Sequence, residues 1–595
     1  MCGIIGYVGK NNNAVQILIN GLKSLEYRGY DSSGIAYFAN NKLNIIKEKG
    51  KVENLEEKIK KQDESSIGIG HTRWATHGVA NSINAHPHSC EKITLVHNGI
   101  IENYELLKDE LIKKGYTFIS DTDSEVISVL LNDLYKKMNI IDALIEIKKI
   151  LKGSYALAIL CNDYDDCIFA IRKDSPLLIS RNKQDIFVAS DVPAFLQYSK
   201  MYSILNEDEI AILKTDSVEI INEKKEKIKK ETITFEGDLK SSQKDGFSHF
   251  MLKEIFEEKD IIKRIATNYN SFEKLIEKLN FLDEYKKIDI VACGSAYHVG
   301  VIAKYLIENL GEIPVNVEVA SEYRYKNNFL NKNDLAIFIS QSGETADSLA
   351  SLRKVKEQGI KTLGIVNVVG SSIAREADIV LYTNAGPEIA VATTKAFVAQ
   401  LTMMILITLY LGFKNKKIGK ERVESVLAQL STLDSYINEM NQYDYKKIAA
   451  ILGNYENVFF IGRGYDYAVA LEGSLKLKEI SYIHSEAYPA GELKHGTISL
   501  IEKGTPVVCL LTDDNIYDKT VSNIKEVKAR GAYTILITNK NSADADLTIN
   551  ISHMDKLITP LLEVIPLQFI AYYVALVKNC DIDKPRNLAK SVTVE

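Results

Sequence analysis

The chain has 595 residues, more than one hydrophobic core usually serves, so we expect three or four domains. A net charge of −6, with 26% charged and 46% hydrophobic residues, is typical of a globular protein and lacks the global positive charge of a nucleic-acid-binding protein. The seven cysteines include no CxxC pair, which argues against a disulfide framework and a structural zinc site. We expect no metal and no cofactor.

Nothing in the sequence indicates export or a membrane span. The longest apolar run, residues 401–413, is shorter than the roughly 20 residues that cross a bilayer, which favours a buried helix. The N-terminus lacks the basic, apolar and small-residue pattern of a signal peptide. We therefore expect a cytoplasmic protein with no membrane and no nucleic acid among its partners, in a compartment that keeps its cysteines reduced.

Residues 1–235 alternate short strand-like runs with few long helical patterns, which predicts a layered α+β domain. The runs are IIGYVG, SIGIGHT, ITLVHNG, YALAILC, DIFVAS and EIAILK. Cys2 directly follows Met1, and removal of Met1 would give Cys2 a free α-amine with a pKa of roughly 7.7–8.0. That amine can take the proton of the Cys2 thiol, so the sequence suggests an N-terminal nucleophile, although any residue can fall at position 2 by chance.

Polar groups in this domain suggest a pocket. HTRWATHG (71–78) holds the only tryptophan, and its polar neighbours favour a loop over a pocket, where Arg73 offers a planar fork for a carboxylate. HNGIIEN (97–103) places Asn98 and Gly99 after an apolar strand, where an amide and a backbone N–H suit an oxyanion hole. In DTDSEV (121–126), Asp123 suits an ammonium group or, equally, a helix N-cap.

After a polar linker, residues 236–247, the pattern changes to apolar strands alternating with long helices, which predicts doubly wound parallel sheets. This part repeats itself at an offset near 170 residues: 290–307 resembles 459–480, and 334–367 resembles 505–539. We expect two copies of one α/β domain, over residues 248–425 and 426–580, with a helical connection around 398–450. The polar tail, 581–595, is either frayed or folded over a site.

Two segments of the duplicated part carry chemistry. SQSGETADS (340–348) gathers hydroxyls, an amide and a helix start at a strand end, which favours a sugar phosphate over a simple N-cap. TDDNIY stands at the corresponding place in the second copy, so we expect one phosphate site per chain. Lys476 and Glu479 share a helix face, either as a salt bridge or, with His495 and Lys590, as acid–base groups for imine formation, proton transfer and ring opening.

The N-terminal motifs resemble the glutaminase domain of the N-terminal-nucleophile amidotransferases. The resemblance rests on Cys2-Gly3-Ile4, LEYRGYDSSG (25–34), HTRWATHG, NAHPH (84–88), HNGIIEN and DTDSEV, in the same order and spacing. It implies that Cys2 attacks the glutamine carboxamide and that Asn98 and Gly99 stabilise the oxyanion. It further implies a glutamine-binding set made of Arg28, Arg73, Trp74, Thr76, His77, Gly99 and Asp123.

The remaining segments resemble the two sugar-isomerase domains of the isomerising glutamine–fructose-6-phosphate aminotransferases, and the likeness extends over essentially the whole chain. It implies that Lys590 forms a Schiff base with fructose 6-phosphate, that Glu479, beside Lys476, moves the proton between C1 and C2, and that His495 opens the ring. The implied sugar-phosphate contacts are Ser295, Ser340, Gln341, Ser342, Thr345, Val391 and Ala589.

The same resemblance implies a homodimer in which His495 serves the neighbouring subunit, and an ammonia tunnel gated by Trp74. The products would be glucosamine 6-phosphate and glutamate, in the first step of amino-sugar biosynthesis. The chain departs from the family pattern at Ala296, Thr393 and Thr497. Three alternatives are an amidotransferase acting on a phosphoribosyl donor, a sugar-phosphate-binding regulator and a deglycating enzyme. The duplicated part disfavours the first, and the glutaminase motifs disfavour the other two.

Overall fold

The computed structural model describes residues 2–40, 42–59, 64–235, 244–540 and 545–593. The chain divides into two compact units, one of Met1–Ser242 with Ala589–Glu595 and one of Gln243–Leu588, and each is described here by itself.

The first unit is built on two antiparallel sheets. The eight-stranded sheet runs in the order β14 (Ile233–Thr234), β11 (Met201–Ile204), β9 (Leu178–Arg181), β10 (Asp185–Ala189), β1 (Gly3–Gly9), β4 (Ile67–Arg73), β2 (Ser32–Ala39) and β3 (Lys42–Lys49). The six-stranded sheet runs in the order β13 (Ser217–Asn222), β12 (Glu209–Lys214), β8 (Tyr164–Lys173), β7 (Gly153–Cys161), β6 (Ile93–Ile101) and β5 (His88–Cys90).

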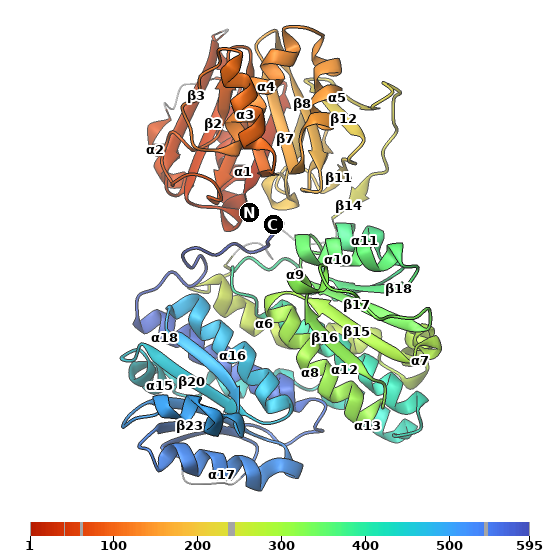
Figure 1. Ribbon diagram of the computed structural model, residues 1–595, viewed down its shortest axis with the longest axis vertical. Coiled ribbons are helices and arrows are strands. Elements are labelled where there is room, and N and C mark those ends of the chain that lie inside the picture. The colour runs from red at the N-terminus through yellow and green to blue at the C-terminus, as the bar shows by residue number, and fades with distance from the viewer. Residues whose placement is uncertain (1, 41, 60–63, 236–243, 541–544, 594–595) are drawn as a thin grey trace. The chain divides into compact units, whose positions relative to one another are not determined.

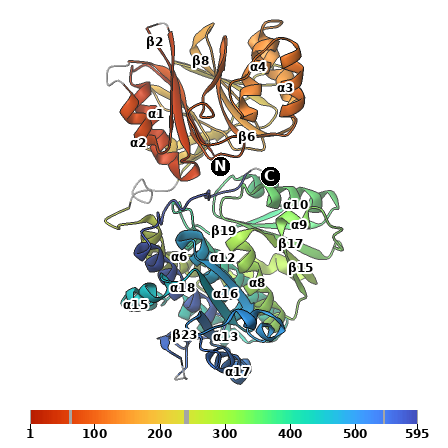
Figure 2. The same ribbon diagram turned by 60° about the vertical axis from the view of Figure 1, so that its left-hand side comes forward.

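Helices cover the outer face of each sheet, giving four layers (Figure 2). The helices α1 (Ala14–Leu25) and α2 (Val52–Lys58) pack on the first sheet, and α3 (Tyr104–Lys113), α4 (Asp123–Tyr135) and α5 (Ile140–Ile150) pack on the second. Strand β4 shows how the sequence specifies this arrangement. Ile67 and Ile69 join the core between the sheets, while Gly68 alternates with them and brings the strand close to Leu18 of α1.

The second unit contains two five-stranded parallel sheets with the same strand order (Figure 1). The first runs β16 (Val315–Val319), β15 (Lys287–Ala292), β17 (Asp334–Ser340), β18 (Lys361–Val366) and β19 (Ile379–Tyr382). The second runs β21 (His484–Pro489), β20 (Asn457–Gly462), β22 (Pro506–Leu511), β23 (Tyr533–Thr538) and β24 (Leu547–Asn550). The identical topology confirms the duplication.

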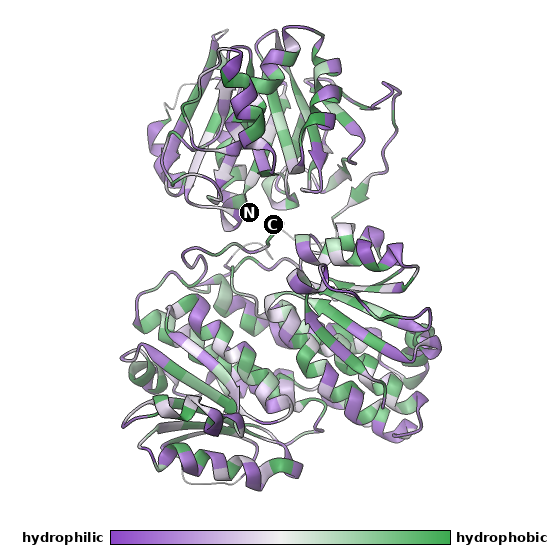
Figure 3. Cartoon of the chain, in the orientation of Figure 1, coloured by the Kyte–Doolittle hydropathy of each residue, from purple (hydrophilic) through white to green (hydrophobic). Residues whose placement is uncertain are grey.

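One apolar core joins the two halves of this unit. It is formed largely by α6 (Phe250–Asn268), α8 (Gly294–Leu310), α12 (Lys395–Lys414), α16 (Tyr465–Ser481) and α18 (Thr559–Val577). The other helices are α7 (Phe272–Leu279), α9 (Ala320–Tyr323), α10 (Ala346–Glu357), α11 (Ser372–Glu376), α13 (Lys420–Leu430), α14 (Asp434–Asn441), α15 (Tyr445–Leu452) and α17 (Tyr517–Lys528). Figure 3 shows green, hydrophobic residues along the buried strands and both colours on α17.

The fold class expected from the sequence is confirmed, and all six N-terminal strand predictions correspond to strands. The apolar run 401–413 lies in a 20-residue helix, longer than the run itself. Within the described residues, α12 and α18 are long and apolar enough to cross a membrane, but 94% and 83% of their most apolar windows are buried inside the protein. Most of the predicted linker, residues 236–243, lies outside the described residues, and the domain boundaries stay predictions.

Candidate active sites

Cys2 lies immediately before β1, the strand that pairs with β10 and β4. Its Sγ accepts a hydrogen bond from the Trp74 backbone N–H at 3.3 Å. Its carbonyl oxygen accepts from Asn98 Nδ2 at 2.9 Å and from Arg28 Nε at 3.3 Å. Arg28 is fixed in turn by an ion pair with Asp191 at 2.6 Å. These contacts hold Cys2 at the start of β1.

Burial raises the pKa of the Cys2 thiol, although the nearby terminal amine, the hydrogen bond from Trp74 and Arg73 oppose the shift. A thiol with a raised pKa is a weak nucleophile at neutral pH unless a base takes its proton. The surroundings of Cys2 therefore require the kind of local base that its own α-amine would supply.

The predicted loop position of Arg73 was wrong. Arg73 is the last residue of β4 and is 4% exposed, so the loop begins at Trp74. Asn98 and Gly99 lie within β6 and pair with β7, as the strand-like run ITLVHNG predicts, and not beyond the end of the strand. Gly99 has φ of +138°, and a Cβ there would meet the Ser154 carbonyl oxygen at 2.0 Å, so only glycine fits.

The Arg73 guanidinium donates to backbone carbonyls of the following loop, those of His77, Gly78 and Val79. The arginine thus shapes the loop of Thr76 and His77, which are part of the predicted glutamine pocket. Asp31 contributes as well, because its carboxylate accepts from the Ala75 N–H at 2.6 Å. The sequence reasoning gave Asp31 no role.

Asp123 is the first residue of α4, and the N-cap is Thr122, whose side chain accepts from the Glu125 N–H. One Asp123 oxygen accepts from the Ile101 N–H at 2.8 Å, which joins α4 to the strand of Asn98 and Gly99. The N-cap alternative for Asp123 is therefore wrong, and its role toward an ammonium group stays a prediction.

Four buried histidines cluster here, three of them on β4, β5 and β6, a feature the sequence reasoning missed although NAHPH contains two of them. The rings of His71 and His86 lie 4.0 Å apart at 10°, and His88 and His97 flank His86. Burial lowers the pKa of all four rings, that of His71 to about 3. They are neutral at physiological pH. In the part of the chain described, no group of His, Cys, Asp or Glu is arranged to hold a metal.

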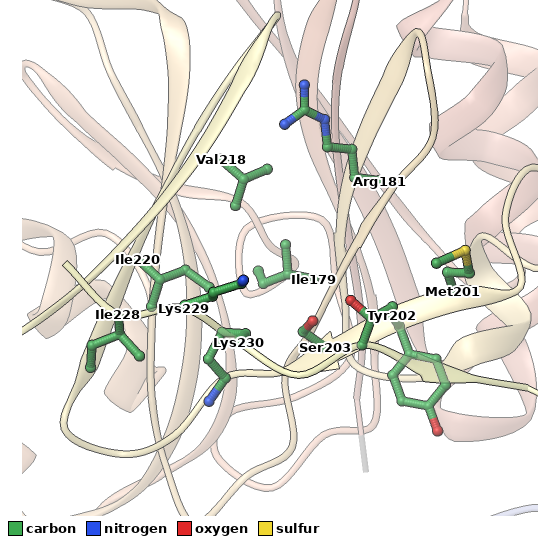
Figure 4. A pocket seen from close by; sticks show the side chains of 11 residues that line it. Ile179, Arg181, Met201, Tyr202, Ser203, Val218, Ile220, Ile228, Lys229 and Lys230 are labelled. Atoms are coloured by element: carbon green, nitrogen blue, oxygen red, sulfur yellow. The ribbon is translucent and has the colours of Figure 1, made fainter.

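A separate cavity of about 320 Å³ opens between strands β9, β11 and β13 (Figure 4). Its floor is apolar, with Ile179, Val218 and Ile220. Two of its three cations have partners within the protein: Lys230 pairs with Glu209 at 2.9 Å, and Arg181 donates to the Asp216 carbonyl. We assign it no ligand.

In the second unit, the predicted phosphate loop follows β17 and leads into α10. Ser340 Oγ accepts from the Gly343 N–H at 3.0 Å and lies 2.9 Å from Thr345 Oγ1. Ser342 Oγ accepts from the Glu344 N–H, and Gln341 lies between the two serines. The hydroxyl groups therefore gather at the carboxyl edge of the sheet and the N-terminus of a 12-residue helix, a favourable site for an anion.

Lys476 is buried on α16 and forms an ion pair with Glu479. It also lies 3.5 Å from Glu472 and donates to Ser295 Oγ at 3.1 Å. The carboxylates of Glu479 and Glu472 raise the pKa of the Lys476 ammonium against the opposite effect of burial. The sequence reasoning missed Glu472, although its i,i+4 spacing from Lys476 was a signal.

The other predicted sugar residues lie apart from that pair in sequence. Val391 donates its N–H to the Asp583 carbonyl at 3.0 Å, which ties the start of the tail to the second unit. Ala589 and Lys590 belong to the last segment, which groups with the first unit, and their roles stay predictions. His495 ends a 3₁₀ turn, Glu492–His495, and is exposed.

The two units define the class: a glutamine amidotransferase domain followed by a duplicated sugar-isomerase module. Models of two families match, the glutamine amidotransferase domain over residues 56–238 and the SIS domain over residues 281–409 and 451–578. The C-terminal domain of glucosamine-fructose-6-phosphate aminotransferase from Francisella tularensis is 39% identical, with a TM-score of 0.55, over 58% of this chain and 99% of that one.

Full-length relatives identify the family. The chain is 49% identical to the glutamine–fructose-6-phosphate aminotransferase (isomerizing) of Caldanaerobacter subterraneus subsp. tengcongensis and 47% identical to that of Clostridium tetani. Both alignments cover 100% of either chain. The chain belongs to the isomerising glutamine–fructose-6-phosphate aminotransferases.

Proposed function

We propose that this enzyme converts fructose 6-phosphate and glutamine to glucosamine 6-phosphate and glutamate. Cys2 attacks the carboxamide of glutamine and releases ammonia, and water hydrolyses the resulting thioester to glutamate. His495 opens the ring of fructose 6-phosphate, and the free ketone forms a Schiff base with Lys590 with loss of water. Ammonia then displaces Lys590 from the sugar, and Glu479 moves a proton between C1 and C2. The exposure of His495 is compatible with service to the neighbouring subunit of a homodimer. The cysteines of the described residues are all free, which favours a reducing compartment such as the cytoplasm.

The observation that carries the proposal is the ion pair of the buried Lys476 with the partly buried Glu479, in the same unit as the hydroxyl-rich loop 340–345. A salt bridge that served stability alone would gain little from burial, because desolvating both charges costs about as much as their attraction returns. A sugar-phosphate-binding regulator would need the loop but neither this pair nor Cys2. A deglycating enzyme would not need the glutaminase unit.

The test is the formation of glucosamine 6-phosphate by purified protein from glutamine and fructose 6-phosphate. Replacing glutamine with ammonium chloride should support a slower reaction, which Cys2→Ala should retain while losing the glutamine-driven one. Glutamine hydrolysis with no sugar product at saturating fructose 6-phosphate would contradict the proposal and favour another amidotransferase.

A further inference from the structure

A continuous line of hydrogen-bonded and ion-paired side chains, buried in its middle part, crosses from the first half of the duplicated module to the second. It begins at His298 on α8, whose Nδ1 lies 2.8 Å from Glu472 Oε2 on α16. The side chain of Glu472 is 1% exposed and that of His298 is 13% exposed, so water contributes little to either. The predicted chemistry gives His298 no role.

The other oxygen of Glu472 continues the line. Ser295 Oγ donates to Glu472 Oε1 at 2.8 Å and accepts from Lys476 Nζ at 3.1 Å. The hydroxyl of Ser295 is thus engaged within the protein, and its predicted contact with the sugar stays a prediction. Through Ser295 and Lys476, the hydrogen bonds connect His298 to Glu479.

The buried ammonium group of Lys476 lies within reach of two carboxylates, those of Glu479 and Glu472. Lys476 makes a closer contact with Glu479 than with Glu472, which lies at 3.5 Å. A buried carboxylate that lacks a donor is costly, so it draws any nearby cation toward itself. A donor on the far oxygen of Glu472 meets that need without Lys476.

We propose that His298 is a positioning residue for the sugar reaction: its hydrogen bond to Glu472 leaves Lys476 against Glu479, the group that moves the proton between the two sugar carbons. The inference rests on the proposed function. A residue of the first half of the module, on α8, thereby positions the Lys476–Glu479 pair of the second half, on α16. The two helices contact each other.

The test compares His298→Ala and His298→Asn in the full chain, with ammonia and fructose 6-phosphate as substrates. His298→Ala should lower kcat about tenfold or more while the KM for fructose 6-phosphate stays within about threefold, because the pair acts in the chemical step. His298→Asn keeps an N–H donor and should restore most of the lost kcat. Equal kcat losses in the two variants, or a loss confined to KM, would overturn the proposal.

Two controls separate positioning from damage to the fold. His484→Ala removes an exposed histidine that lies 3.7 Å from Glu486 at the surface, and it should change neither constant. Glutamine hydrolysis by Cys2 should be unchanged in every variant. In protein that already carries Glu472→Gln, adding His298→Ala should lower kcat little further. A second loss of kcat as large as that of His298→Ala alone would overturn the proposal. Failure of the parent enzyme to form glucosamine 6-phosphate would instead count against the proposed function.

Discussion

At the scale of single residues, Cys2 is held firmly in place, but its thiol is a weak nucleophile by itself. The Trp74 N–H, the Asn98 amide and Arg28 fix its sulfur and carbonyl, while burial raises the pKa of its thiol. A thiol in that state needs a base within reach. The thiol contacts the backbone N–H and the carbonyl oxygen of Trp74, and neither group can take its proton.

We therefore expect active protein to lack Met1, because only then does Cys2 carry its own free α-amine. Intact-mass measurement of active enzyme should show the chain beginning at Cys2. A variant in which removal of Met1 is blocked should lose glutamine hydrolysis and keep the ammonia-driven reaction. Full glutaminase activity in protein that retains Met1 would refute this requirement.

Glu258 is a second residue whose surroundings oppose its charge. It is fully buried on α6, and burial, with Glu388 and Glu254 nearby, raises its pKa well above the usual range. For a carboxyl with a raised folded-state pKa, stability is complete below the unfolded pKa of about 4.5 and is lost as pH rises toward the folded value. The neutral amide of glutamine does not incur that loss.

Glu258→Gln should thus gain stability over the parent as pH rises from 5 to 8, by up to about 1.4 kcal/mol per pH unit, because the parent must either bind a proton or ionise a buried carboxyl. Thermal unfolding at several pH values measures the difference. The exposed Glu357→Gln on α10 is the control and should change little. A gain that is the same at every pH would mean that ionisation is not its cause.

At the scale of elements, the loop between β17 and α10 depends on one glycine. Gly343 has φ of +65°, and a Cβ there would lie 2.0 Å from Ser371 Oγ. Its N–H donates to Ser340, so its conformation sets the cluster of hydroxyls. A side chain at this position would both strain the backbone and collide with the neighbouring loop.

Gly343→Ala should raise the KM for fructose 6-phosphate about tenfold or more, since misplaced donors lose hydrogen bonds to the phosphate. Gly359→Ala is a matched control: φ there is +72°, but a Cβ would meet nothing within 4 Å. It should lower stability by about 1 kcal/mol through backbone strain and leave KM unchanged. Similar KM values for Gly343→Ala and Gly359→Ala would show that this loop does not bind the phosphate.

The stacked histidines make the first unit sensitive to acid. A histidine whose folded pKa lies below its unfolded value of about 6.5 stabilises fully above that pH, and its contribution is lost as pH falls toward the folded value. Each such ring adds up to about 1.4 kcal/mol per pH unit to the slope below pH 6.5. His71, with a pKa of about 3, contributes over the widest range.

We expect urea unfolding of the first unit, followed by Trp74 fluorescence, to show stability falling steeply from pH 6.5 to 5. His88→Asn removes one ring while keeping a polar group toward Thr122, which lies 3.1 Å from His88 Nε2. In this variant the free energy of unfolding should depend less steeply on pH, by the slope that corresponds to the uptake of about one proton. An unchanged slope would mean that carboxylates, not the histidines, set the acid limit.

At the scale of the whole molecule, ammonia made in one unit must be used in the other, so the two sites have to communicate. The Trp74 backbone N–H donates to Cys2 Sγ, and Trp74 begins the loop that Arg73 holds. It is the only tryptophan in the chain, which makes its fluorescence a direct report on that loop.

Fructose 6-phosphate and a glutamine analogue should each change the Trp74 signal, and the sugar should tighten binding of the analogue by about 1–3 kcal/mol, a typical coupling energy. Trp74→Ala should uncouple the sites, so less glucosamine 6-phosphate forms per ammonia released. Trp74→Phe, which keeps an aromatic ring, should preserve most of the ratio. An unchanged ratio in Trp74→Ala would exclude Trp74 as the gate.

The sequence by itself determined the fold class, the duplication and most of the residues at the proposed sites. Strand periodicity depends on nearby residues, and the motifs 71–78 and 340–348 keep their chemistry in short contiguous segments. These are local properties, and a local pattern suffices to find them.

Only the tertiary structure decided which residues hold those groups in place. Asp191 and Asp31 are remote in sequence from the residues they contact, and Glu472 meets His298 across 174 positions. The pairing of Asn98 and Gly99 with Ala156 and Tyr155 of β7 likewise joins segments that are far apart in the sequence. Ion pairs, strand pairing and buried hydrogen bonds join distant segments, so no local pattern encodes them, and they exist only once the chain has folded.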